Sequence, residues 1–453
     1  MGNRPAVICA LAASEPALKI AVALIIELIN TGTELMLGHT LNTHQQWLCN
    51  RLADLGYSVT RQVAVPDTGP EIQAAVREAL GRADLILTTG GLGPTSDDLT
   101  RDLIAQLLGR PLHENAKVLA HIASFFARRN YPLPAGNQVQ ALVPAGAQVL
   151  WNPLGTAPGL ALEVRPNPFR PDGKVSWLIM LPGPPRELRP MFTELVAPLL
   201  REKLPLEEAF AGRTLRTVGI GESALQAQIA APLQSLVAAG MELGYCAHSG
   251  QVDVRLAARG NRAAELVADG EKTVREVVGP SIFAEGDASL ESVVVRRLTE
   301  RKRTLAVAES CTGGCLAHRL TNVPGASAVF LAGLVTYSNE AKQTFLGVRA
   351  ETLAQHGAVS EAVVLEMAEG ARRVTGADFA LAVTGIAGPG GGTEQKPVGT
   401  VFLALAGGFP TVVRQHLNLW ERETFKQVTA NQALELLRRA LDTTDHGQSG
   451  QPV

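Results

Sequence analysis

Residues 305–315 read LAVAESCTGGC, and this stretch decides how the C-terminal part of the chain folds. An apolar run ends there in small polar residues and two glycines, and a helical pattern opens at Cys315. The pattern predicts a buried strand, a sharp turn and a helix N-terminus. Because such a turn can present a hydroxyl where backbone N–H groups point at an incoming anion, Ser310 is the first candidate for catalysis.

Two further stretches could complete a site around Ser310. Residues 335–342 (VTYSNEAK) place Tyr337 and Lys342 across a strand-to-helix junction, with Ser338 or Asn339 as the N-cap. Residues 381–392 (LAVTGIAGPGGG) predict a strand that runs into a glycine-rich loop. A serine paired with a lysine can hydrolyse an amide, with lysine as general base and backbone N–H groups as oxyanion hole. The lysine pKa would then have to lie below its usual value of ~10.4.

Other interpretations of these residues stay open. Cys311, Cys315 and His318 are spaced i, i+4, i+7, so on a helix they would share a face and could form a metal site. Cys311 could itself be the nucleophile. Taken alone, Ser310 could be a helix cap, and Lys342 could be a solvated surface charge.

A second glycine-rich motif lies in the N-terminal half, where residues 88–100 read TTGGLGPTSDDLT. Glycines after a strand let the backbone close on a phosphate, and the following helix N-terminus adds partial positive charge. Asp97 and Asp98 would suit a divalent cation that bridges a diphosphate. The alternative is that both acids only cap the helix.

Three other clusters of polar residues and glycines could complete this N-terminal site. They are residues 30–34, which include Gly32 and Glu34, residues 152–159, and residues 181–187. Each cluster taken alone is more typical of a structural turn.

The composition indicates a globular chain of two or three domains. The chain has 453 residues, of which 46% are hydrophobic and 19% charged. A net charge of −2 offers no basic field for nucleic acid, and five cysteines without framework spacing indicate a reducing cytoplasm. The apolar run 20–29 is short and interrupted by Glu27, so it predicts a buried strand rather than a membrane span.

Apolar runs alternate with helical patterns from residue 20 onward. The predicted strands are 21–29, 58–65, 83–88 and 252–258, and the predicted helices are 42–55, 69–80 and 222–239. Such alternation predicts an α/β fold with a mostly parallel sheet covered on both faces. Ligands in such sheets bind at the carboxyl ends of the strands.

Composition shifts divide the chain into five segments. Residues 1–19 are expected to be an extension, although they faintly resemble a signal peptide. A first domain (20–198), a small α/β middle domain (199–286) and a third domain (287–443) follow, and residues 444–453 form a polar tail that we expect to be disordered.

The longer motifs closely resemble the CinA family, the competence/damage-inducible proteins. The resemblance is carried by residues 306–314, 336–342 and 383–389, and residues 396–401 (KPVGTV) continue it. Residues 89–100 resemble the other half of the same family, which is similar to molybdopterin-binding domains. The chain is therefore identified as a member, with an N-terminal three-layer α/β/α domain, a small middle domain and a C-terminal α/β amidase domain.

The resemblance implies two activities on one chain. The C-terminal domain looks like a nicotinamide mononucleotide deamidase, which releases ammonia and nicotinate mononucleotide and needs no cofactor. The N-terminal domain is similar to domains with a metal-dependent ADP-ribose pyrophosphatase activity, which yields AMP and ribose 5-phosphate.

Roles in the C-terminal site follow from the matched motifs. The resemblance implies that Ser310 is the nucleophile, Lys342 the base and Tyr337 a supporting donor. The family usually carries Gly-Asp-Arg-Glu before its last helix, where residues 420–423 read WERE, so Arg422 fits a contact to the substrate phosphate although the lost glycine changes the loop. Substrate binding is implied for Thr312, Gly313, Thr384, Gly385, Gly388 and Arg422.

Roles in the N-terminal site are implied in the same way. A divalent metal cation is expected on Asp97 and Asp98. Nucleotide binding is implied for Gly32, Glu34, Gly90, Gly91, Gly93, Asn137, Gly155, Thr156, Gly183 and Glu187.

We expect a cytoplasmic homodimer that acts on nicotinamide mononucleotide and ADP-ribose, with no membrane and no direct nucleic-acid partner. A different class of function stays open, namely a non-catalytic scaffold of competence and DNA-damage pathways. Its N-terminal pocket would then hold a pterin or a nucleotide without turnover.

Overall fold

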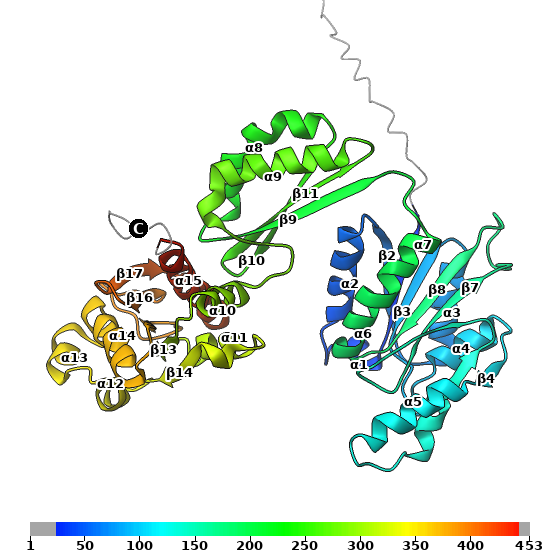
Figure 1. Ribbon diagram of the computed structural model, residues 1–453, viewed down its shortest axis with the longest axis horizontal. Coiled ribbons are helices and arrows are strands. Elements are labelled where there is room, and N and C mark those ends of the chain that lie inside the picture. Colours follow the sequence, from blue (N-terminus) through cyan, green and yellow to red (C-terminus); the bar gives the residue numbers. More distant parts are fainter. Residues whose placement is uncertain (1–23, 444–453) are drawn as a thin grey trace, which may run out of the picture. The chain divides into compact units, whose positions relative to one another are not determined.

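The computed structural model describes residues 24–443, and the chain divides between Ala209 and Phe210 into two compact units (Figure 1). The expected N-terminal extension and the expected polar tail lie outside the described residues. Within residues 24–443, no helix is long and apolar enough to cross a bilayer.

The first unit is built on a six-stranded sheet of order β2-β1-β3-β8-β7-β6. Its strands are β1 (Ile26–Thr31), β2 (Val59–Val65), β3 (Leu85–Thr89), β6 (Gln148–Leu150), β7 (Gly159–Val164) and β8 (Ser176–Leu181). The four strands from β2 to β8 pair in parallel, whereas β7 and β6 pair antiparallel. The sheet is therefore mostly parallel, as predicted, and its one antiparallel edge follows because the connections there contain no crossover helix.

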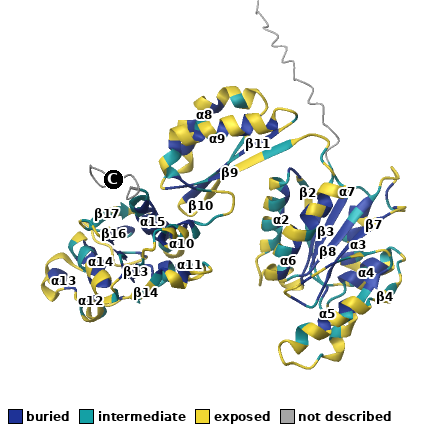
Figure 2. Ribbon diagram, in the orientation of Figure 1, coloured by how far each residue is buried: buried dark blue, intermediate teal, exposed yellow. Residues whose placement is uncertain are grey.

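Helices cover both faces of this sheet, which gives the predicted three-layer α/β/α arrangement. The helices are α1 (Thr33–Met36), α2 (Thr43–Asp54), α3 (Gly69–Leu80), α4 (Thr100–Leu107), α5 (Ala116–Ala127), α6 (Pro185–Met191) and α7 (Ala197–Lys203). Apolar side chains of α2, α6 and α7 pack on one face of the sheet, and those of α3 and α4 on the other. Figure 2 shows the central strands as buried, which explains their near-continuous apolar sequences. A small ribbon of β4 (Leu112–Glu114) and β5 (Leu142–Pro144) stands apart from the sheet.

Helix α7 corrects the predicted boundary after residue 198. Pro198 lies inside an unbroken helical run, in which a π-helical turn (Phe192–Val196) joins α6 to α7. Leu199 and Leu200 are buried in the core of the first unit. The helix therefore belongs to the first unit, and the second unit begins at Phe210.

The second unit begins with a small layer of two helices on an antiparallel sheet of order β10-β11-β9-β12. Its elements are β9 (Phe210–Val218), α8 (Glu222–Ala238), β10 (Glu242–His248), β11 (Gln251–Arg259), α9 (Ala263–Val278) and β12 (Ile282–Glu285). The predicted helix 222–239 and strand 252–258 correspond to α8 and β11.

A five-stranded sheet of order β14-β13-β15-β16-β17 forms the rest of the second unit. Its strands are β13 (Leu305–Glu309), β14 (Phe330–Val335), β15 (Phe379–Gly385), β16 (Thr400–Ala406) and β17 (Val412–Leu417). Its helices are α10 (Leu290–Glu300), α11 (Cys315–Thr321), α12 (Asn339–Leu346), α13 (Ala350–His356), α14 (Glu361–Thr375) and α15 (Arg422–Thr443). Strands β13 and β15 turn leucine and valine towards α10, α11 and α15, and alanine towards α14. Small side chains on that second face let α14 pack closely on the sheet.

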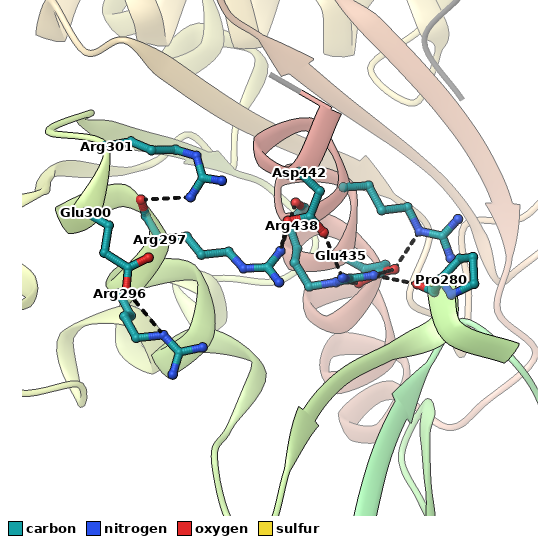
Figure 3. Close-up of polar contacts among 9 residues, drawn as sticks. Pro280, Arg296, Arg297, Glu300, Arg301, Glu435, Arg438 and Asp442 are labelled. Carbon is teal, nitrogen blue, oxygen red and sulfur yellow. Dashed lines mark hydrogen bonds and ion pairs between the residues drawn. The ribbon is translucent and has the colours of Figure 1, made fainter. Parts of the chain in front are cut away.

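Polar contacts join the small layer to this larger part through α15 (Figure 3). The buried Arg438 side chain pairs with Glu435 at 2.6 Å and donates to the Pro280 carbonyl at 2.7 Å. Asn431, earlier in the same helix, accepts a hydrogen bond from Gln251 of β11 at 2.9 Å. The two parts of the second unit therefore share a polar interface.

Candidate active sites

Ser310 follows β13 directly, at the carboxyl end of the central parallel strands of the second unit. Strand β13 pairs in parallel with β14 on one side and β15 on the other. The Ser310 N–H donates to the Val383 carbonyl of β15 at 3.0 Å, which ties the turn to the sheet. The predicted strand, turn and helix are all present, and α11 begins at the predicted Cys315.

Lys342 lies against Ser310. It comes from α12, whose N-cap is Ser338, since the Ser338 hydroxyl accepts from the Ala341 N–H at 3.1 Å. The Lys342 Nζ lies 3.1 Å from Ser310 Oγ, and the lysine side chain is 1% exposed. The interpretation of Lys342 as a solvated surface charge is therefore wrong.

The surroundings of the Lys342 amine favour its neutral form. Burial lowers the pKa of Lys342 from its ordinary value, because a charged amine loses solvation there. Its Nζ also lies 2.8 Å from the Thr336 carbonyl and 3.2 Å from the Tyr337 carbonyl. A neutral amine has two N–H donors for these carbonyls and one lone pair, which can accept the proton of Ser310.

Arg422 joins two of the predicted segments. One guanidinium nitrogen donates to the Gly388 carbonyl at 2.7 Å, and another donates to the Tyr337 hydroxyl at 2.9 Å. The Glu421 carboxylate accepts from the N–H groups of Glu423 and Thr424, at 2.7 Å each, and so caps α15. Both Tyr337 and Arg422 are exposed, so the guanidinium can reach a ligand at the surface.

The other predicted residues of this site differ in their contacts. The Thr384 hydroxyl donates to the Ala358 carbonyl at 2.8 Å, so it holds a loop and is not free to donate to a substrate. A Cβ at Gly385 would lie 2.8 Å from the backbone of β16, so this glycine permits a close approach of chains. Gly313 lies in the turn with φ +60°. The Thr312 hydroxyl is buried, and among residues 24–443 it has no hydrogen-bond partner.

The cysteines do not form the alternative metal site. Cys311 lies in the turn before α11, so it does not share a helical face with Cys315 and His318. No group of three metal-binding side chains occurs within the described part of the chain. Burial raises the pKa of the Cys311 thiol to about 12, which argues against a thiolate nucleophile.

A pocket of about 570 Å³ lies in the first unit, at the carboxyl ends of its parallel strands. This is the edge of such a sheet at which ligands bind, so the ligand site predicted there stays a prediction. Of the predicted residues, the pocket is lined by Gly32, Glu34, Gly90, Gly91, Gly93, Asp97, Asp98, Thr156, Gly183 and Glu187.

Two glycines shape the floor of this pocket. Gly90 has φ +96°, and a Cβ there would lie 2.7 Å from the Thr31 carbonyl at the end of β1. Gly91 has φ +65°, and a Cβ there would lie 2.0 Å from Thr100 Oγ1 at the start of α4. Only glycine fits both positions, so the loop after β3 stays close to the neighbouring strand and helix.

The two adjacent acids differ from each other. The Asp98 carboxylate accepts from the Thr95 N–H at 2.9 Å and from the Thr95 hydroxyl, so it braces the turn. Asp97 is exposed, and its hydrogen bond with Thr95 lowers its pKa. Neither acid is the N-cap of α4, which is Leu99, so the interpretation as helix caps is wrong. A Mg²⁺-like ion needs only one or two carboxylates when substrate phosphates supply the other oxygens, and Asp97 and Asp98 fit that donor set.

Gly155 and Asn137 do not line the pocket, although their neighbours do. A Cβ at Gly155 would lie 2.0 Å from Oε2 of Glu187, whose carboxylate is buried and accepts from Asn152 at 2.8 Å. Asn137 donates to Gln140 at 3.0 Å. Both residues therefore support lining residues instead of facing a ligand.

His44 is a pocket residue that sequence reasoning missed. It lies on α2, and it lines the pocket together with Asp67 of the segment after β2. Burial lowers the pKa of His44, against the raising effect of its hydrogen bond with Gly183. A lone histidine on a predicted amphipathic helix carried no signal of its own. Only its place at the strand ends could have revealed it.

Comparison with known proteins places both sites in one family. Three family models match the chain: a probable molybdopterin binding domain (residues 27–202), the damage-inducible protein CinA KH domain (212–284) and the CinA C-terminal domain (287–441). A CinA-like protein of Akkermansia muciniphila is 47% identical over 410 residues, which cover 90% of this chain and 95% of that protein. The chain belongs to the CinA family.

Two further CinA proteins are also similar to parts or all of the chain. A putative competence-damage inducible protein of Moorella thermoacetica is 46% identical over 92% of this chain and 98% of its own length. A solved CinA superfamily protein of Klebsiella pneumoniae is 40% identical, with a TM-score of 0.33, and covers 34% of this chain and 96% of its own.

The middle layer of this CinA chain matches a KH model but lacks one KH feature. KH domains hold a nucleic-acid backbone with a GXXG loop. The loop between β9 and α8 reads Gly219-Ile220-Gly221, α8 begins with Glu222, and residues 212–284 contain no GXXG sequence. The absence of a direct nucleic-acid partner therefore stays a prediction.

Proposed function

We propose that this CinA protein is a bifunctional enzyme of pyridine-nucleotide recycling. Its C-terminal domain hydrolyses the amide of nicotinamide mononucleotide, and its N-terminal domain hydrolyses ADP-ribose. The observation that supports the first activity best is the 3.1 Å approach of the buried Lys342 Nζ to Ser310 Oγ. Among residues 24–443, no carboxylate pairs with Lys342, and such a buried lysine suits a general base far better than a structural charge.

The first half of the amidase reaction forms an acyl-enzyme. Ser310 Oγ attacks the amide carbon while Lys342 Nζ takes the hydroxyl proton, and a tetrahedral oxyanion forms. The resulting ammonium of Lys342 gives that proton to the amide nitrogen. The C–N bond breaks, ammonia leaves, and the nicotinoyl group remains as an ester on Ser310.

The second half returns the enzyme to its starting state. A water molecule attacks the ester carbon while Lys342 takes its proton. The same proton returns to Ser310 Oγ when the ester bond breaks, and nicotinate mononucleotide leaves. Arg422 is exposed beside Tyr337 and the Gly388 loop, so its guanidinium can hold the substrate phosphate throughout.

The N-terminal proposal depends on the pocket and its acids. Asp97 and Asp98 would hold a divalent cation, which would neutralise charge on the diphosphate. The backbone around Gly90 and Gly91 would contact the phosphates. The product pair would be AMP and ribose 5-phosphate.

Ammonia release from nicotinamide mononucleotide tests the C-terminal proposal. Ser310→Ala should abolish it, because within residues 24–443 the Ser310 hydroxyl is the one hydroxyl that hydrogen-bonds Lys342 Nζ. Ser327→Ala, which changes an exposed serine of the same domain, should leave it intact. Full activity in Ser310→Ala would exclude this nucleophile.

AMP formation from ADP-ribose tests the N-terminal proposal. It should be lost on addition of a chelator and restored by a divalent cation. If the protein binds ADP-ribose but never forms AMP, the alternative of a nucleotide-binding scaffold is correct for this half.

The homodimer and the cytoplasmic location stay predictions. Size-exclusion chromatography with light scattering tests whether the protein is a homodimer.

A further inference from the structure

Glu309 is a buried carboxylate directly before Ser310 for which the proposed reaction has no role. Its side chain is fully buried. One oxygen, Oε2, accepts from the N–H groups of Gly314 at 3.0 Å and Leu316 at 3.1 Å. The other, Oε1, accepts from the Ala317 N–H at 2.8 Å. The last residue of β13 thus caps α11, the helix that follows the nucleophile.

This cap removes the N-terminus of α11 as a place for a substrate anion. The first N–H groups of a helix lack partners within the helix, and a carboxylate satisfies them better than a neutral cap. Two more N–H groups of the turn are also used, since Gly313 donates to the Ser310 carbonyl at 3.1 Å and Cys315 donates to the Thr312 carbonyl at 3.2 Å. The oxyanion of the reaction therefore needs other donors.

The N–H groups of Cys311 and Thr312 are the donors that remain in this turn. Neither has a backbone acceptor within residues 24–443. The Cys311 N–H lies beside its own thiol, which is a weak acceptor. It also belongs to the residue after the nucleophile, whose N–H supplies the oxyanion hole in the nucleophile elbows of serine hydrolases.

We propose that Glu309 is a positioning residue that reserves the Cys311 and Thr312 N–H groups for the oxyanion. By holding Gly314, Leu316 and Ala317, its carboxylate sets the shape of the turn and excludes the substrate from α11. The inference rests on the proposed role of Ser310 as nucleophile.

The variant Glu309→Gln tests this role in the full chain. Glutamine keeps the size of the side chain, but its NH₂ group faces backbone donors instead of accepting from them. We expect kcat for nicotinamide mononucleotide, normalised to folded enzyme, to fall ~10- to 100-fold, with KM within ~3-fold, because a donor that acts in the transition state is displaced.

The matched control is Ser289→Ala, which removes the side-chain cap of α10 in the same domain. It should lower stability and leave kcat unchanged. A Glu309→Gln enzyme with unchanged kcat, or one that changes only KM, would overturn the inference.

A measurement on the unmutated chain keeps the test independent of folding. The chain has five cysteines, so ¹⁵N-cysteine labelling resolves the Cys311 and Cys315 amides of the full-length protein. Pyridine-3-boronic acid is the probe, because a serine oxygen that adds to boron creates a tetrahedral anion. At saturating probe we expect the Cys311 resonance to move and the Cys315 resonance to stay.

The opposite pattern, or a Cys311 resonance that stays in place in an active enzyme, would refute the inference. Failure of this inference can be distinguished from failure of the proposed function. An enzyme that releases no ammonia but shows the Cys311 shift lacks the proposed substrate, yet keeps the assigned donors.

Discussion

Replacing Lys342 by methionine separates catalysis from stability in one experiment. Methionine has a similar length and no charge, so it removes the amine that lies 3.1 Å from Ser310 Oγ while filling much of the same buried space. The backbone carbonyls of Thr336 and Tyr337 lose a donor at 2.8 Å and 3.2 Å.

The expected magnitudes follow from these contacts. A positioned general base contributes ~10²- to 10⁴-fold to the rate, so kcat should fall by at least ~10²-fold. Because Ser310 and Lys342 act as one unit, the loss should approach that of Ser310→Ala, and the double variant should be no worse. Each carbonyl left without its donor costs about 1–3 kcal/mol, whereas removing a desolvated amine is favourable. The free energy of unfolding should therefore fall by less than the ~2–6 kcal/mol that the two carbonyls would cost by themselves.

The pH dependence has a definite sign. Burial lowers the pKa of Lys342, and only the neutral amine can take the serine proton. The wild-type rate should therefore rise with pH through that lowered pKa. Between it and the usual value of ~10.4, the unfolded chain binds more protons than the folded chain, so wild-type stability should also rise with pH. Methionine should remove both dependences.

The assay is ammonia release from nicotinamide mononucleotide across a pH series, together with chemical unfolding of the same samples. Lys272→Met is the control, because Lys272 is exposed on α9 and pairs only loosely with Glu276 at 4.0 Å. A Lys342→Met enzyme that keeps more than ~10% of wild-type kcat would refute the reasoning, because a lost general base removes at least ~10²-fold.

Three more predictions follow from individual contacts. Arg422→Met should raise KM for nicotinamide mononucleotide ~10-fold or more and leave kcat within ~3-fold, because a charge-assisted contact to the substrate phosphate is lost. An unchanged KM in steady-state kinetics would contradict this prediction. Asp98→Asn should lower AMP formation from ADP-ribose ~10-fold or more, because the carboxylate that braces Thr95 loses its charge, and ammonia release should be unaffected. Gly91→Ala should destabilise the first unit by about 1–3 kcal/mol in urea unfolding, since φ is +65° and the new Cβ would meet Thr100; an unchanged midpoint would refute the clash.

Local patterns predicted the elements well where the signals were strong. The helix predicted over 69–80 is α3 with the same bounds, because a proline in its first turn and an amphipathic pattern mark it clearly. The boundary after residue 198 failed for the opposite reason. In the sequence, a proline inside a helical run resembles one in a linker, and only the burial of Leu199 and Leu200 in the core of the first unit distinguishes the two cases.

In the candidate sites, too, local sequence patterns predicted some residues and missed others. Glycine-rich turns after strands correctly marked the pocket of the first unit, since only glycine suits positive φ at Gly90 and Gly91. The pattern did not reveal His44, which reaches that pocket from a helix. It also did not reveal that Glu309 would cap α11 from the strand before it.

By itself, the sequence determined where the strands end and which chemical groups stand there, because those features depend on neighbouring residues. It placed Ser310 after a buried strand and Lys342 in the first turns of a helix. Only the tertiary structure decided that these side chains, 32 positions apart, lie at 3.1 Å, and that Arg422 reaches Tyr337 across 85 positions. Strand order and helix packing set such distances, and they depend on contacts throughout the core. The same packing buries Lys342 and lowers its pKa, which makes a common surface residue a candidate base.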